Sequence, residues 1–269
     1  MTSKKTPQDI LSGLQQGLAF TMEDMYQLNL SGFNLENAKL NKAILIRGNF
    51  SKANLQGADL TEADLRGADV SQAILSNANL QGACLYRVDL SGTDLQGAIL
   101  TNAKLLGAKY DSQTIFPEGF AYKSSGAIGP NANLNGAKFN TANLRNADLQ
   151  GASLLGAYFA GADLTGANLK GARLSQADFR RAFLTGVCLR GARINGANLS
   201  GADLRAADMT NIEFEELESI AGADFTHVQG LSKEMRKRLL SLAPSQLDTP
   251  HNITRRTTRA SLMPGELIL

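Results

Sequence analysis

Large apolar residues recur at every fifth position over most of the chain. The pattern is uninterrupted from Ala53 to Arg87, where the sequence reads ANLQG ADLTE ADLRG ADVSQ AILSN ANLQG ACLYR. A period of five fits neither the 3.6 residues per turn of an α-helix nor the two-residue alternation of a strand. Each unit is therefore predicted to be a short extended segment followed by a corner, so that the chain has to coil.

The repeat fills two blocks. The first runs from Leu30 to Tyr110 and the second from Leu134 to Phe214, with seventeen large apolar centres in each. The residue two before each centre is usually Ala, and side chains two apart on an extended segment point the same way. We expect both to point inward, with Asp or Asn between them at the outer turn edge and Gly at the fifth place easing the corner.

The number of units in one coil is suggested by three phenylalanines. Phe139, Phe159 and Phe179 replace Leu at intervals of twenty residues, which is four units. If each coil has four sides, these residues stack on one side as a core ladder. Random interchange of Leu and Phe within a core is the alternative interpretation.

The A(D/N)LxG units, which extend over about residues 29 to 214, resemble the pentapeptide-repeat family. The resemblance implies an all-β solenoid, a right-handed quadrilateral parallel β-helix with coils of about twenty residues. Because the ends of such a solenoid expose core side chains, we expect N- and C-terminal helical caps.

The N-terminal segment 1–28 is predicted to contain a capping helix before the first repeat block, 29–110. Thr6 and Pro7 form a helix start, with Pro at the first helical position. The apolar residues of this helix share one face, which should cover the first coil. They are Ile10, Leu11, Leu14 and Leu18.

The C-terminal part is predicted to contain the second block with an acidic collar, 131–228, a capping helix, 229–244, and a flexible basic tail, 245–269. The helix should start after Ser232 and end before Pro244, with Met235, Leu239 and Leu242 apolar and its Lys and Arg residues polar. The alternative role for this helix is a dimer contact. The tail lacks any period, which favours flexibility.

Residues 111–130 break the repeat and are predicted to form a loop. The segment is rich in Pro and Gly, and it gathers Phe116, Phe120 and Tyr122 close to Tyr110. Two interpretations stay open: the rings fold back onto the edge of the coil, or they form a protrusion that binds a partner.

Composition and charge limit the class of protein. There is no Trp, aromatic residues make up 6%, and the formal net charge is +2, so Leu and Ala must fill the core. Residues 212–228 hold five acidic and no basic residues, which separates two basic stretches. No long apolar run occurs, so we expect a cytoplasmic protein without membrane insertion.

Residues for catalysis or metal binding are scarce. The two histidines, His227 and His251, lie outside the repeats. Cys84 and Cys188 are separated by four or more coils, beyond the reach of a disulfide. No zinc pattern or phosphate-binding loop occurs. The sequence therefore predicts a non-enzymatic protein with no cofactor, no metal and no small-molecule substrate.

One group of basic residues is a candidate binding surface. Lys170 and Arg190 are twenty residues apart, as are Arg173 and Arg193, so a square coil brings all four near one corner. Arg180 and Arg181 fall on the intervening coil and are expected to belong to the same basic patch, which suits an acidic protein or phosphates. Scattered solvated charges are the alternative.

The favoured function is a scaffold or regulatory protein whose β-helical surface binds another protein, of unknown identity. A homodimer through the C-terminal helix is a further possibility. Some members of the family mimic DNA and modulate a type II topoisomerase such as gyrase, but mimicry requires a strongly acidic face. The first block has eight Lys or Arg against seven Asp or Glu, and residues 131–211 have nine against five. Weak nucleic-acid binding through the basic patch is the remaining alternative.

Overall fold

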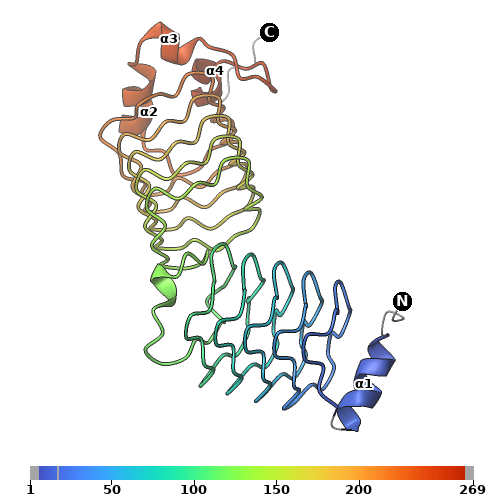
Figure 1. The fold of residues 1–269 in the computed structure, drawn as a ribbon. Coiled ribbons are helices and arrows are strands. Elements are labelled where there is room, and N and C mark those ends of the chain that lie inside the picture. The colour runs from blue at the N-terminus through green and yellow to red at the C-terminus, as the bar shows by residue number, and fades with distance from the viewer. Residues whose placement is uncertain (1–5, 17, 264–269) are drawn as a thin grey trace. The chain divides into compact units, whose positions relative to one another are not determined.

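The computed structural model describes residues 6–16 and 18–263. The chain divides into two compact units, Met1–Gly129 (unit 1) and Pro130–Leu269 (unit 2). Both units are stacks of coils, drawn in blue to green for unit 1 and in green to orange for unit 2 (Figure 1). In the described residues, no helix has the length and apolar character needed to cross a membrane.

Parallel bridges hold successive coils together. Every fifth residue pairs with the residue one coil ahead, as Asp24 pairs with Ile44 in unit 1 and Asn133 with Ser153 in unit 2. Four such rows run along each unit, because twenty residues contain four bridge positions. The prediction of four repeat units per coil is confirmed by this register.

The interior of each coil is filled as the pattern predicts. Leu30, Ala58 and Leu60 have no exposed surface in unit 1, and Ala172 and Leu174 have none in unit 2. The inward orientation of the Ala and Leu positions is thereby confirmed. Burial of these side chains, together with the ladder hydrogen bonds between coils, supplies the stability that one coil alone lacks.

The corners depend on two devices that recur with the period. The Asp59 carboxylate accepts a hydrogen bond from the Thr61 backbone N–H at 3.0 Å, which forms a local Asx turn. At the third turn position the backbone is left-handed, with φ +65° at Gly57. Positive φ at that position is typical of a type II turn and explains the preference for Gly there.

Helix α1, Pro7–Gln15, precedes the first coil. The Thr6 Oγ1 atom accepts a hydrogen bond from the Asp9 backbone N–H at 3.2 Å, and the buried Ile10 has no exposed surface. The coil begins earlier than predicted, because the Phe20 N–H already donates to the Lys39 carbonyl at 2.8 Å. Residues 20–28 therefore belong to the first coil and not to a helical segment.

Leu18 does not join the apolar face of α1 as predicted. It lies beyond the end of the helix, and its side chain is 54% exposed. The helix is shorter than the apolar pattern suggested, because the chain has to turn into the first coil at Phe20. The predictions for the Leu11 and Leu14 side chains lie outside the described residues.

Three helices follow the last coil: α2, Lys233–Leu240, α3, Pro244–Leu247, and α4, Thr258–Leu262. The Ser232 side chain accepts the Met235 N–H and caps α2, which ends at Leu240. In Figure 1 the three helices lie at the end of the coils of unit 2.

The prediction of a flexible tail after Pro244 is wrong for the described residues. Leu247 and Leu262 have no exposed surface. The Ser261 hydroxyl accepts from the Phe225 N–H at 3.0 Å, and the Gln246 side-chain oxygen accepts from the Ile220 N–H at 2.9 Å. The segment lacks a period but still carries apolar residues and polar partners that satisfy the last coil. Residues 264–269 of the predicted tail are outside the described part.

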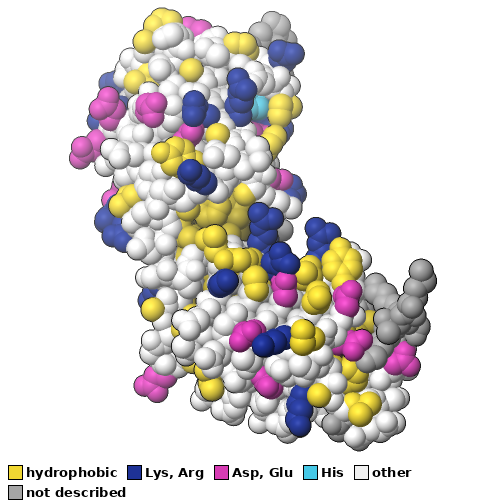
Figure 2. Space-filling view, in the orientation of Figure 1, with side chains coloured by type: hydrophobic (Ala, Val, Ile, Leu, Met, Phe, Trp, Pro, Cys, Tyr) yellow, Lys and Arg dark blue, Asp and Glu magenta, His cyan; other side chains and the backbone are white. Residues whose placement is uncertain are grey.

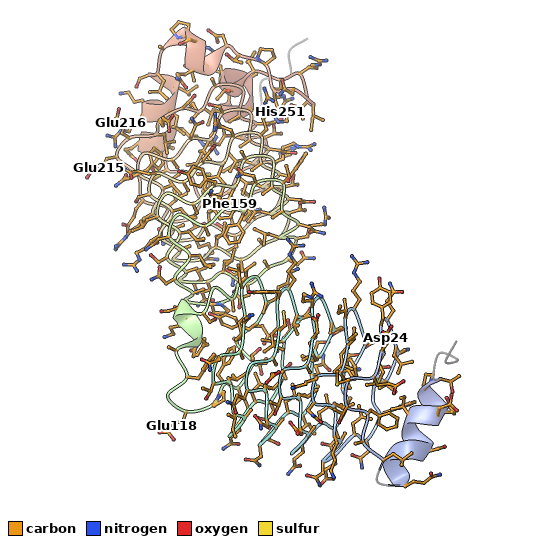
Figure 3. All side chains as sticks on the ribbon, in the orientation of Figure 1. Asp24, Glu118, Phe159, Glu215, Glu216 and His251 are labelled. Carbon is orange, nitrogen blue, oxygen red and sulfur yellow. The ribbon has the colours of Figure 1, made fainter. Side chains whose placement is uncertain are left out.

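The acidic collar contains one extra residue. Arg193 pairs with Glu213 at the usual interval of twenty, whereas Asn198 pairs with Ser219, one residue later. The extra residue falls in the corner that contains Glu215 and Glu216, which point outward from the coil in Figure 3. The ladder resumes after this insertion and ends with the pair of Asp208 and Gln229.

Candidate functional site

The loop at 111–130 is partly built into the coil of unit 1. The Asp111 side chain accepts from the Gly92 N–H at 2.9 Å, and the Thr114 hydroxyl donates to the Leu90 carbonyl at 2.8 Å. Ile115 and Ile128 take bridge positions opposite Asp94 and Lys109. Only the part between these bridges leaves the coil, and it includes a short 3₁₀ helix, Tyr122–Ser124.

The aromatic rings of this loop pack against one another and against Tyr110. Phe116 and Tyr122 are stacked with 4.5 Å between ring centroids, and both meet the Tyr110 ring edge-on, at 5.3 and 5.5 Å. Phe120 stacks on Phe116 at 5.9 Å. The three loop rings are half-buried and Tyr110 is 4% exposed. This geometry favours the interpretation that the rings fold back onto the coil.

Four of the predicted basic residues lie around one corner of unit 2. Arg173 and Arg193 form a bridge pair, and the Gly171 N–H donates to the Arg190 carbonyl, which places Lys170 and Arg190 in adjacent coils. Their side chains are exposed at this corner. The structure therefore brings Lys170, Arg173, Arg190 and Arg193 together.

Arg180 and Arg181 do not belong to that group. Their backbone partners in the neighbouring coils are Gly161 and Ser200, in a different corner. Ten residues separate Arg180 from Arg190, which is two sides of a four-sided coil, so the two corners are diagonally opposite. The prediction that all six residues form one patch is wrong, because residues of adjacent coils lie together only when they occupy the same side of the coil.

Acidic neighbours compensate much of this positive charge. Arg193 pairs with Glu213 at 2.9 Å, Arg190 lies 3.7 Å from Asp208, and Arg180 pairs with Asp178 at 2.7 Å. Exposed ion pairs of this kind contribute little to stability, but they reduce the local potential that an acidic partner would encounter. Of the six predicted basic residues, Lys170, Arg173 and Arg181 form no ion pair with the described residues.

The same ion pairs affect the acidity of the carboxylates. The side-chain hydrogen bond from Arg180 holds the pKa of Asp178 below its usual value. Burial alone raises the pKa of Asp203, but hydrogen bonds and charge from Arg205 outweigh it, so this pKa is also lowered. Both carboxylates therefore stay ionised well into the acidic range, and neither is suited to proton transfer near neutral pH.

Phe139, Phe159 and Phe179 form one stack inside unit 2. Their ring centroids are 5.2 and 4.9 Å apart, and the second pair of rings is almost parallel, with an interplanar angle of 3°. Phe159, labelled in Figure 3, and Phe179 are almost fully buried, whereas Phe139 in the first coil is half-buried. The stack fills the core and does not form a binding surface.

A polar network at the end of unit 2 escaped sequence analysis. The Thr254 hydroxyl donates to the Asp224 carboxylate at 2.6 Å and lies 3.2 Å from the Nδ1 atom of His251. Asp224 is 1% exposed and His251 is 2% exposed, whereas Thr254 is half-buried. The spacing of these residues carries no motif, and only the folding of 245–263 onto the last coil brings them together.

No arrangement typical of catalysis or metal binding occurs in the described residues. There, no three side chains of His, Cys, Asp or Glu gather in a way suited to holding a metal ion. Cys84 and Cys188 are both free.

Comparison with protein families gives one match, to the family model described as pentapeptide repeats. It covers residues 24–57, 53–92, 87–109, 130–166, 157–196 and 184–216, well over half of the chain. No curated protein matches the sequence.

Several solved structures are similar to this chain. HetL, a pentapeptide-repeat protein involved in heterocyst differentiation regulation from the cyanobacterium Nostoc sp. strain PCC 7120, is 28% identical, with 84% of this chain and 94% of HetL covered and a TM-score of 0.43. A pentapeptide-repeat protein of the Arabidopsis thaliana thylakoid lumen is 32% identical over 48% of this chain and 86% of its own, with a TM-score of 0.25. QnrB1, a plasmid-mediated fluoroquinolone resistance protein, is 20% identical. The comparison covers 80% of this chain and 99% of QnrB1, with a TM-score of 0.23.

Proposed function

Because the chain belongs to the pentapeptide-repeat family, we propose that it is a non-enzymatic scaffold or regulatory protein that presents the outer surface of its coils to another protein. The observation that carries this proposal is the burial of the Ala and Leu positions, which fill the coil interior and leave only outward side chains for contact. Right-handed winding and a capping role for α1 and for α2 to α4 are part of the proposal.

The rigidity of the outer surface supports this function. Each outward residue sits in a ladder that is hydrogen-bonded on both sides, as Tyr158 lies between Lys138 and Asp178. Neighbouring side chains therefore repeat at about 4.8 Å along each side. A preorganised surface loses little conformational entropy when it binds, so even modest contacts contribute to affinity.

The charge distribution weighs against mimicry of DNA. Several of the carboxylates between the inward positions are paired with arginines, as in Asp64 with Arg66 and Asp203 with Arg205. A duplex mimic requires a dense, uncompensated row of negative charge. We therefore place protein binding first and interference with a topoisomerase second.

A crosslinking scan tests the proposal. A photoreactive amino acid is introduced at one outward position on each side of each unit, for example at Ile99, Tyr158 and Phe183, and the full chain is exposed to extract from its source cell. We expect crosslinks to a discrete protein from one side, and excess unmodified chain should compete them away. Absence of competable crosslinks from every position would overturn the proposal.

A further inference from the structure

One corner row of unit 1 carries large side chains where the other three rows carry smaller polar ones. We call it the aromatic edge; it consists of Tyr26, Ile46, Arg66, Tyr86 and Leu106. The equivalent positions of the next corner form a serine edge, Ser31, Ser51, Ser71 and Ser91. The remaining two rows hold Glu36, Gln56, Ser76 and Gln96, and Asn41, Thr61, Gln81 and Thr101. All four corners make the same turn, so the backbone does not require large residues at one of them.

The aromatic edge is accessible to a partner. Leu106 is 65% exposed, and the Tyr26, Ile46 and Tyr86 side chains are half-buried. Ile44, two residues before Ile46 in the same coil, is 39% exposed. Asp24 in Figure 3 marks the N-terminal end of this edge, and Figure 2 shows hydrophobic and basic side chains near each other on this side of unit 1. The edge is thus a continuous, mixed apolar and basic row.

Two arginines flank this row in an unfavourable backbone conformation. Arg47 has φ 55° and Arg87 has φ 58°, whereas the same position in the intervening coils is Gly67 and Gly107. A left-handed residue other than glycine costs on the order of 1 kcal/mol. Other residues share this conformation at the other corners, for example Lys52 with φ 59°, so it is the position of Arg47 and Arg87 beside the aromatic edge that sets them apart.

The alternation of Arg and Gly also orients the arginine side chains. The Arg47 Cγ atom lies 3.6 Å from the position that a Cβ atom on Gly67 would occupy, and the Arg87 Cγ atom lies 3.5 Å from that of Gly107. The stem of each arginine therefore crosses the glycine of the next coil. The glycines thus leave room for the arginine stems beside the aromatic edge.

The charge of the edge favours an acidic partner. Arg66 is compensated by Asp64, with 2.6 Å between the Nη2 and Oδ2 atoms. Arg47 and Arg87 form no ion pair within 4.0 Å in the described residues. Two uncompensated cations beside an apolar row match a surface that combines carboxylates with apolar side chains.

The secondary structure of the partner follows from the hydrogen bonding of the edge. Its backbone groups are used between coils, since the Arg47 N–H donates to the Arg66 carbonyl at 3.0 Å and the Gly67 N–H to the Tyr86 carbonyl at 2.9 Å. A partner strand therefore finds no free row of backbone groups. Side chains repeat here every ~4.8 Å, close to the 5.4 Å pitch of an α-helix.

We propose that the aromatic edge binds an acidic amphipathic α-helix of a partner protein. About four steps of the ladder span roughly 19 Å, which corresponds to about 13 helical residues. Apolar residues on successive turns of the helix contact Ile46, Tyr86 and Leu106, and its carboxylates contact Arg47 and Arg87. The inference rests on the proposed function and names the partner class for one side of the molecule.

A single-stranded nucleic acid fits the edge less well. Stacking of bases requires a series of flat rings, whereas Ile46 and Leu106 alternate with the tyrosines and Arg66 is held by Asp64. The contacts that the edge offers suit the apolar and acidic side chains of an amphipathic helix.

Binding of designed peptides to the full chain tests the proposal. The probe is a stapled helix with leucines at every third or fourth position and flanking glutamates; a second peptide replaces the glutamates by lysines. We expect saturable binding of the acidic peptide by fluorescence anisotropy and at least tenfold weaker binding of the basic one. Equal binding of both peptides, or binding of neither, would overturn the proposal.

Matched variants locate the binding site. The double variant Arg47→Gly, Arg87→Gly should fold at least as well as the parent chain, because glycine suits both backbone positions, and should bind the acidic peptide roughly tenfold more weakly. Lys52→Gly removes a charge from the equivalent left-handed position of the serine edge, with φ 59°, and should not alter binding. Tyr86→Ser, which gives this corner the residue of the serine edge, should weaken binding by a similar factor.

Three other results contradict the proposal. These are equal loss of binding in Lys52→Gly, self-association of the chain in sedimentation that Tyr86→Ser abolishes, and tighter binding of an oligonucleotide than of the acidic peptide. Any of these results would contradict only the binding of an acidic helix. The proposed function would still be supported if the scan described above gave crosslinks from other sides of the coils.

Discussion

The two units are built from the same repeat but are closed differently at their C-terminal ends. In unit 1 the last large apolar centre of the repeat, Tyr110, contacts the half-buried rings of Phe116 and Tyr122 from one short loop. In unit 2 the segment after Pro244 folds onto the last coil, and polar side chains such as Ser261 accept its backbone N–H groups. An open coil therefore needs both apolar cover and hydrogen-bond partners, and the chain supplies them in different proportions at each end.

The interior of each stack of coils also differs from its ends in the number of neighbouring coils that each residue has. Within the coils, every position is dictated by its neighbours one coil away, and Phe159 lies between Phe139 and Phe179. At the ends one neighbour is missing, so irregular segments replace it. We expect substitutions to have their largest effect in the interior, a smaller one at the covers and the smallest at outward ion pairs.

The largest effect is expected for Phe159→Ala. The ring is fully buried between two others, so its removal should lower the free energy of unfolding by about 4 kcal/mol. Urea unfolding gives the magnitude, and hydrogen exchange should place the lost protection in unit 2. Phe139→Ala is the matched control and should cost clearly less, because Phe139 is half-buried; equal costs would contradict the end effect.

The aromatic cover of unit 1 is tested by Tyr110→Ala. This ring is 4% exposed and meets two loop rings, so its loss should cost about 3 kcal/mol. Hydrogen exchange should show the loss at the loop and last coil of unit 1. Phe116→Ala removes a more exposed ring of the same cluster and should cost about half as much. If neither change alters exchange there, the rings do not cover the coil.

The polar cover of unit 2 is tested by Thr254→Val. This change leaves the buried Asp224 Oδ2 atom without the hydroxyl that donates to it at 2.6 Å, which should cost about 2 kcal/mol. Thr249→Val removes an exposed hydroxyl from the same segment and should have an effect of at most about 0.5 kcal/mol. Similar thermal melting of both variants would show that the network does not anchor the C-terminal segment.

The smallest effect concerns the outward ion pairs and depends on pH. The pKa of Asp203 is lowered in the folded protein, so its contribution is present above the unfolded value of about 3.9 and is lost as pH falls through the folded value. Asp203→Asn should cost about 1 kcal/mol at pH 7 and almost nothing in strong acid. Asp178→Asn should show a smaller change, because its partner Arg180 is more exposed. A cost that does not vary with pH would refute this assignment.

Local pattern was sufficient for the coil and insufficient for its ends. The period of five placed Leu30 and Leu134 inside, because every unit repeats the same inward pair. The apolar pattern placed Leu18 in the first helix, but the chain turns into the coil at Phe20 before reaching that register. The absence of a period after Pro244 wrongly predicts flexibility, since the contacts of this segment with Ile220 and Phe225 have no local signature.

Candidate surface residues were predictable along the coil axis and less so around it. Counting in twenties brought Arg173 next to Arg193, because that interval is one full coil. Arg180 was misplaced because ten residues lead to the opposite corner. The His251, Thr254 and Asp224 network could not be found from sequence, since two of its members lie thirty residues apart with no period between them.

The sequence by itself determined the coiling and its inward residues, because a strict repeat gives every unit the same neighbours; the four sides were suggested by the spacing of three phenylalanines and are confirmed by the bridge register. Only the tertiary structure decided how the final coils are covered and which charges are compensated. The reason is that these features depend on side chains from segments that meet once, at the end of a stack, where no repeated neighbour constrains the choice.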